Sequence, residues 1–171
     1  MRKLIFICAL LLLCASMASA QTNRAFKKGY QGNVEIGNYA VFGKDKVGSL
    51  MQISTTHGYS TGTGMFVGLG FGAGYDMFVD GPMGSAFMDA KYNFIDTAVS
   101  PFASVRTGFR VYDYYGFQPF ISISGGVDVG HFTVKVGYDY GNIRTTDYFN
   151  GARIQTFRKP SQLFCSFAVK F

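Results

Sequence analysis

Residues 65–77 read MFVGLGFGAGYDM, and this stretch alternates two kinds of side chain without a break. Because successive side chains of a β-strand point to opposite faces, the pattern predicts a strand with one apolar face and one small face. The apolar column is Met65, Val67, Leu69, Phe71, Ala73, Tyr75 and Met77, and the other column is Phe66, Gly68, Gly70, Gly72, Gly74 and Asp76.

The same period of two recurs along the rest of the chain. Most of the alternating segments have about the 9–11 residues that a tilted transmembrane strand needs. We expect eight strands, at 30–36, 47–59, 65–77, 84–94, 102–111, 117–129, 132–140 and 163–171. Since a sheet in lipid cannot leave unpaired backbone at an edge, the predicted fold is an all-β, eight-stranded, antiparallel up-and-down transmembrane barrel.

Charged residues within these segments fall on the face opposite to the apolar one. They are Glu35, Asp76, Asp89, Lys91, Arg106, Arg110, Asp128, Lys135, Asp139 and Lys170. Acidic and basic groups balance in this set, and glycine and serine surround them. Because buried charges must be paired and a narrow barrel has little room inside, we expect them to line the lumen as a structural network. Binding of a cation by Asp76, Asp89 and Asp128 is the alternative explanation of these three aspartates, and it is less economical than pairing with the basic residues of the lumen.

Aromatic residues cluster at the ends of the segments, as in the interfacial girdles of membrane barrels. One expected girdle is Tyr30, Tyr59, Phe94, Phe102, Phe132 and Phe171, and the other is Tyr39, Tyr75, Tyr112, Phe117 and Tyr140. A soluble lipocalin-like carrier is the alternative, with its apolar face inside and its charges in water.

The composition supports a membrane protein that crosses without helices. Among 171 residues, 48% are hydrophobic, 17% aromatic and only 15% charged. After residue 20 no apolar run reaches the length of a transmembrane helix. The formal charge of +6 is modest and lacks a dense basic run, so nucleic acid is not an expected partner.

The first residues have the form of a cleavable signal peptide. Met1 to Lys3 is positively charged, 4–14 is apolar, and Ala18-Ser-Ala20 is a small-residue cleavage site. We therefore expect a signal peptide at 1–20 and a barrel domain at 21–171. A lipoprotein signal at Cys14 is disfavoured because Leu13 precedes it. Cys165 then remains alone, so no disulfide within the chain is expected.

With both termini in the periplasm, the connections alternate between short turns and outer loops. Short turns are expected at 60–62, at 95–100 and near residue 130, and outer loops at 39–46, 79–83, 113–116 and 142–160. The last loop carries Arg144, Arg153, Arg158 and Lys159. These four are candidate contacts to lipopolysaccharide phosphates, and a merely solvated loop is the alternative.

Several stretches resemble small outer-membrane β-barrel proteins of the Bacteroidetes type and, more broadly, OmpX-like and OmpA transmembrane barrels. The stretches are GNVEIG at 32–37, the glycine-alternating strand at 68–75, KYNFID at 91–96, SPF at 100–102 and the last strand. The resemblance implies an outer membrane of a Gram-negative bacterium. It also implies that Phe167, Val169 and Phe171 are the signal read by the outer-membrane assembly machinery.

A role follows less directly from the sequence. We expect a monomer with a structural or surface-interaction role through its outer loops, with no enzymatic activity, cofactor or metal, and with outer-membrane lipids and lipopolysaccharide as partners. The alternatives are a small pore and a lipid A-modifying enzyme. Such an enzyme needs a histidine near the outer leaflet, whereas His57 and His131 fall at the periplasmic side.

Overall fold

The computed structural model describes residues 25–42, 47–77, 80–112, 116–141, 143–149, 152–158 and 161–171. The predicted signal peptide at 1–20 lies outside these residues and stays a prediction. No helix in the described part is long and apolar enough to cross a membrane.

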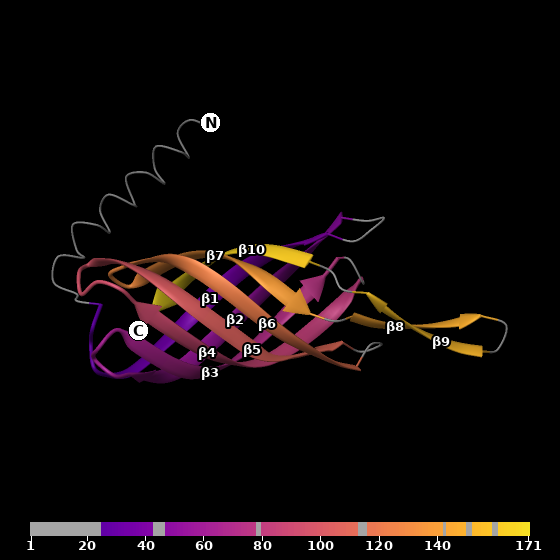
Figure 1. Cartoon of the computed structure of the whole chain (residues 1–171), viewed down its shortest axis with the longest axis horizontal. Helices are drawn as coiled ribbons and strands as arrows, with labels where there is room; N and C mark the ends of the chain where they lie inside the picture. The colour runs from indigo at the N-terminus through magenta and orange to yellow at the C-terminus, as the bar shows by residue number, and fades with distance from the viewer. Residues whose placement is uncertain are drawn as a thin grey trace, which may run out of the picture.

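The described residues contain ten antiparallel strands, joined in part by short turns (Figure 1). They are β1 (Gly29–Phe42), β2 (Val47–Ser60), β3 (Met65–Asp76), β4 (Gly81–Asn93), β5 (Val99–Tyr112), β6 (Gly116–Val129), β7 (Phe132–Gly141), β8 (Ile143–Phe149), β9 (Ala152–Arg158) and β10 (Ser161–Lys170). Eight of them close a barrel in the order β1-β10-β7-β6-β5-β4-β3-β2. β1 pairs with β10 from Asn33↔Lys170 to Phe42↔Ser161, so the first and last strands complete the ring. The predicted fold is confirmed.

The two ends of the barrel differ. At one end, which we call the tight-turn end, short connections at 61–64, 94–98 and 130–131 join the strands and Phe171 ends the chain. At the other, the hairpin end, β8 and β9 pair with each other and project beyond the barrel (Figure 1).

All four loop predictions at the hairpin end are corrected. β1 continues to Phe42 inside the expected loop at 39–46, β4 already begins at Gly81 inside the expected loop at 79–83, and β6 begins at Gly116, the last residue of the expected loop at 113–116. The expected loop at 142–160 contains the β8–β9 hairpin. In each case backbone pairing between neighbours extends the ladder past the point where the apolar alternation weakens.

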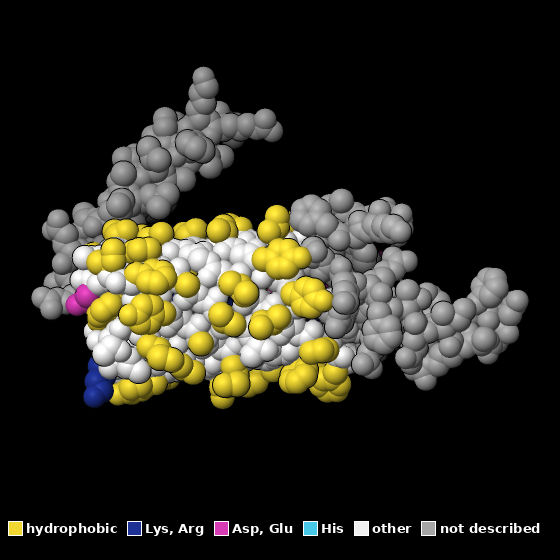
Figure 2. Space-filling view, viewed as in Figure 1, with side chains coloured by type: hydrophobic (Ala, Val, Ile, Leu, Met, Phe, Trp, Pro, Cys, Tyr) yellow, Lys and Arg dark blue, Asp and Glu magenta, His cyan; other side chains and the backbone are white. Residues whose placement is uncertain are grey.

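The apolar columns point outward and the charged columns point inward. Leu69 is 57% exposed and Phe71 is 63% exposed, whereas Asp76 and Asp139 are fully buried. Figure 2 shows hydrophobic side chains spread over the barrel wall, with the few charged side chains in view confined to the tight-turn end. This orientation is opposite to that of a lipocalin-like carrier.

Three residues assigned to the girdles lie inside instead. Tyr39, Phe102 and Tyr112 are each buried to 3–4% exposure. They share the inward phase of their strands: Tyr39 has the phase of Glu35, and the other two have the phase of Arg106. Strand phase therefore outweighs position near a strand end. The other proposed girdle residues face outward, as expected, and are Tyr30, Tyr59, Tyr75, Phe94, Phe117, Phe132, Tyr140 and Phe171.

The glycine column of β3 makes room for large side chains in the lumen. A Cβ atom on Gly70 would lie 2.3 Å from the Phe87 ring, and one on Gly68 would lie 2.8 Å from the Phe66 ring. The Phe87 ring in turn carries the Arg106 guanidinium, 4.1 Å from its centroid. Glycine thus positions an aromatic ring, and the ring positions a buried cation.

Candidate functional site: the charged lumen

The predicted network of lumen charges is present, arranged in three tiers along the barrel axis. All ten predicted residues point into the lumen, and six ion pairs join nine of them. The tenth, Asp76, accepts a hydrogen bond from the Tyr112 hydroxyl at 3.1 Å.

The middle tier links strands on opposite sides of the barrel. Arg106 Nη2 lies 2.7 Å from Asp89 on the neighbouring strand and 2.8 Å from Glu35, which stands across the lumen on β1. β1 and β5 are four strands apart in either direction around the ring, so this bond spans the full width of the lumen. Lys135 Nζ reaches the same Glu35 carboxylate at 2.8 Å. Two cations and two anions neutralise this tier.

The tier at the tight-turn end centres on Asp128. Its Oδ2 atom lies 2.9 Å from Lys91 Nζ and 3.2 Å from Lys170 Nζ. Asn93 Nδ2 donates to the same oxygen at 2.9 Å, and the Thr133 hydroxyl donates to Oδ1 at 2.6 Å. Two lysines share one carboxylate, so this tier holds one positive charge in excess.

At the hairpin end the Arg110 guanidinium binds Asp139 through two parallel hydrogen bonds of 2.9 and 2.8 Å. Its guanidinium carbon lies 4.3 Å from the centroid of the Phe120 ring. With Asp76 nearby on β3, this tier holds one arginine and two aspartates. The lumen is neutral as a whole, but its charge is divided along the axis, which the sequence alone did not reveal.

An apolar cluster closes the lumen at the hairpin end. We call it the apolar plug; its members are Tyr39, Leu50, Met83, Tyr112 and Phe164. They come from five different strands, and the rings of Tyr39 and Phe164 stack at 4.9 Å. Two small cavities in the lumen, both lined by Phe66 and Lys91, measure about 20 and 10 Å³, space for a single water molecule at most. Sequence reasoning missed the plug, although the inward phase of Tyr39 and Tyr112 pointed to it.

Neither histidine lies in the lumen. His57 faces outward from β2, with Tyr30 Oη at Nδ1 and Thr55 Oγ1 3.0 Å from Nε2. His131 lies in the turn between β6 and β7, where Nδ1 donates to the Lys170 carbonyl at 3.1 Å. Both belong to the tight-turn end, as predicted. No cluster of three metal-ligating side chains occurs among the described residues.

The other candidate residues lie at the two ends of the barrel. Phe167, Val169 and Phe171 form an outward column on and just after β10, and Phe167 stacks on Phe132 at 5.7 Å. In the hairpin, Arg144 pairs with Phe157, Arg153 with Tyr148 and Arg158 with Ile143. The structure describes only the backbone of these three arginines, and Lys159 lies outside the described residues.

No protein-family model matches the sequence, and no curated protein matches it. Solved structures do match. The outer-membrane enzyme PagL superposes with a TM-score of 0.63 at 13% identity, covering 80% of this chain and 98% of that one. Neisserial surface protein A gives 0.57 at 15% identity, covering 85% and 99%.

The N-terminal β-barrel domain of Pseudomonas aeruginosa OprF gives a TM-score of 0.51 at 17% identity, covering 85% of this chain and all of that domain. The chain has the fold of a small outer-membrane β-barrel. At these identities the similarity shows the fold alone, since the three barrels include a surface protein and an enzyme.

Proposed function

We propose that this protein is a monomeric barrel of the outer membrane of a Gram-negative bacterium, with a structural or surface-interaction role through its hairpin end and no conducting pore. The outward apolar face supports the location, because one Lys or Arg facing mid-bilayer lipid costs about 2–4 kcal/mol and the charged residues of the eight barrel strands point inward. With the hairpin end at the cell surface, the tight-turn end faces the periplasm.

The absence of a conducting pore is inferred from the filling of the lumen. Three tiers of ion pairs and the apolar plug occupy it, and an eight-stranded barrel is only wide enough for its own side chains. A solute would have to break the bond between Arg106 and Glu35, which spans the barrel.

Two measurements test this proposal. Fractionation with gel mobility before and after boiling reports membrane location and a closed barrel together. In planar bilayers we expect no conductance steps above background. Clear, reproducible steps from the pure protein would instead support the small-pore alternative.

We further propose that the β8–β9 hairpin contacts lipopolysaccharide phosphates through Arg144, Arg153, Arg158 and Lys159. Reversing these four charges should abolish any rise in thermal stability caused by added lipopolysaccharide. The control reverses Lys28 at the opposite end, whose ammonium group is not part of any proposed phosphate contact, and should leave that rise intact. An equal effect of both variants would contradict a specific role of the hairpin.

The outward column at the end of β10 is proposed as the recognition signal for the assembly machinery. The column lies on β10, the strand that closes the barrel by pairing with β1. Binding of β10 by the assembly machinery would therefore bring in the strand that completes the ring. Replacing Phe171 by Ser should lower the fraction that is inserted in cells while leaving refolding into lipid vesicles unchanged. Equal losses in both assays would assign Phe171 to stability instead.

No enzymatic activity is proposed, because both histidines stand at the tight-turn end, away from the outer leaflet. Mass spectrometry of lipid A from cells with and without the protein tests this. A change in acyl chains that depends on the protein would overturn it.

A further inference from the structure

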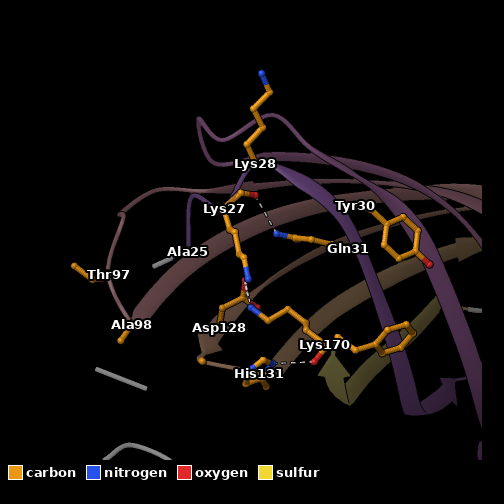
Figure 3. A pocket seen from close by; sticks show the side chains of 12 residues that line it. Ala25, Lys27, Lys28, Tyr30, Gln31, Thr97, Ala98, Asp128, His131 and Lys170 are labelled. Carbon is orange, nitrogen blue, oxygen red and sulfur yellow. Dashed lines mark hydrogen bonds and ion pairs between the residues drawn. The ribbon is translucent and has the colours of Figure 1, made fainter. Parts of the chain in front are cut away.

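A cavity of about 120 Å³ opens at the tight-turn end, next to Asp128 and Lys170 of the charge network (Figure 3). Its lining comes from residues 25–28, the start of β1, the 94–98 turn, the end of β6 with the 130–131 turn, and the end of β10. The space is large enough for several water molecules, or for one phosphate group with some water.

Residues 25–28 form one wall of this mouth cavity because they are tied across the barrel opening. The Phe26 amide donates to Asp96 Oδ1 at 2.9 Å, and the Gln31 side-chain amide donates to the Lys27 carbonyl at 3.3 Å. The Phe26 ring also occupies the space where a Cβ atom of Gly64 would stand. The position of Lys27 is therefore set by contacts with three neighbouring segments.

Cations outnumber anions around the cavity: Lys27, Lys28 and Lys170 line it, and Asp128 is the one acidic side chain in its lining. Lys170 belongs to the tier in which two lysines share Asp128. The Asp128 carboxylate is already occupied by Asn93 and Thr133 as well. Lys27 extends toward this group in Figure 3, and its ammonium forms no ion pair with any residue of the described part. An unneutralised positive charge next to a cavity attracts an anion.

The cavity also opens at the level of the lipid headgroups. Tyr30 and Phe171 line it, and both are exposed aromatics of the girdle at this end. Such girdles lie at the membrane–water interface. The anion within reach at this level is the phosphate of a phospholipid.

We propose that the mouth cavity is a phosphate-binding site, in which the ammonium groups of Lys27 and Lys170 hold one phosphate group. In the membrane this group belongs to a phospholipid of the periplasmic leaflet. The choice of lipid as the source rests on the proposed membrane location, whereas binding of the phosphate group itself does not.

The test uses the folded protein in a maltoside detergent, which contains no phosphate. Inorganic phosphate is titrated at constant ionic strength, and the amide NMR signals of Gly130, His131 and Lys170 are followed. We expect saturable shifts, with affinity about three- to tenfold weaker in Lys27→Gln, the size expected for losing one charge-assisted contact at a partly exposed site.

Lys28→Gln is the matched control: Lys28 also lines the cavity, but its ammonium end extends away from it in Figure 3. It should change the affinity less than twofold. Shifts that chloride reproduces at the same ionic strength would overturn the site, and so would equal losses in the two lysine variants.

A second arm identifies the source of the phosphate. In bilayer discs of phosphatidylglycerol, the NMR signals of the same amides should already have the positions of the phosphate-bound protein. They should not shift when inorganic phosphate is added. In discs of a phosphate-free glycolipid they should still respond. An equal response in both bilayers would overturn the lipid as the source. A protein that does not enter either bilayer would refute the membrane location without affecting the titration in detergent.

Discussion

Arg106 offers the sharpest test of how the lumen is held together. Replacing it by Met keeps an unbranched side chain against the Phe87 ring but removes the guanidinium that bridges Asp89 and Glu35. Glu35 keeps its bond to Lys135 at 2.8 Å. Asp89, whose only ion pair within the described chain is with Arg106, would become an uncompensated buried charge.

Leaving one member of a buried pair without its partner costs about 3–5 kcal/mol, so Arg106→Met should lower the free energy of unfolding by that amount. Adding Asp89→Leu removes the stranded charge and leaves Glu35 and Lys135 as a neutral pair. We expect the double variant to recover at least about 2 kcal/mol, since apolar replacement of a whole buried pair is often nearly neutral.

The assay is urea unfolding in lipid vesicles, followed by the gel mobility of the folded and unfolded bands. Ser104→Ala is a control in the same lumen, because it removes a neutral hydrogen bond to Ser124 and should cost only about 0.5–1.5 kcal/mol. If the Arg106 and Asp89 substitutions destabilise additively, the argument that Arg106 serves to neutralise Asp89 is refuted.

Three further predictions test the two faces of the barrel. Phe71→Arg, near the middle of the outward face of β3, should cost about 2–4 kcal/mol in vesicles, whereas Tyr30→Arg at the rim should cost about 0–1 kcal/mol; equal costs would contradict a lipid-facing wall. Gly108→Ala should destabilise by about 1–3 kcal/mol in urea titrations, because its Cβ would lie 2.1 Å from the Ala86 carbonyl oxygen; Gly125→Ala, with its nearest atom at 3.6 Å, should be tolerated. Cys165, exposed on β10, should react in vesicles with a lipid-soluble maleimide but not with a charged one, and rapid labelling by the charged reagent would place that face in water.

The sequence alone was sufficient to predict the number of barrel strands, the two faces of each of them and the closed barrel. A period of two is a local property, and every residue of a strand contributes to it. Because the ten charges share one phase, their place in the lumen was also predictable. The hairpin of β8 and β9 was not, since alternation at 142–160 is weak and only backbone pairing defines it.

Only the tertiary structure decided which charges meet. Arg106 binds Glu35 across the ring, 71 residues away in sequence, because closure and strand tilt bring β1 opposite β5 at that height. The same closure turns Tyr39 and Tyr112 into a plug, and it brings Lys27 beside the end of β10. Phase determines which face a side chain occupies, but the stagger of the closed barrel determines its neighbours, and no local pattern encodes that stagger.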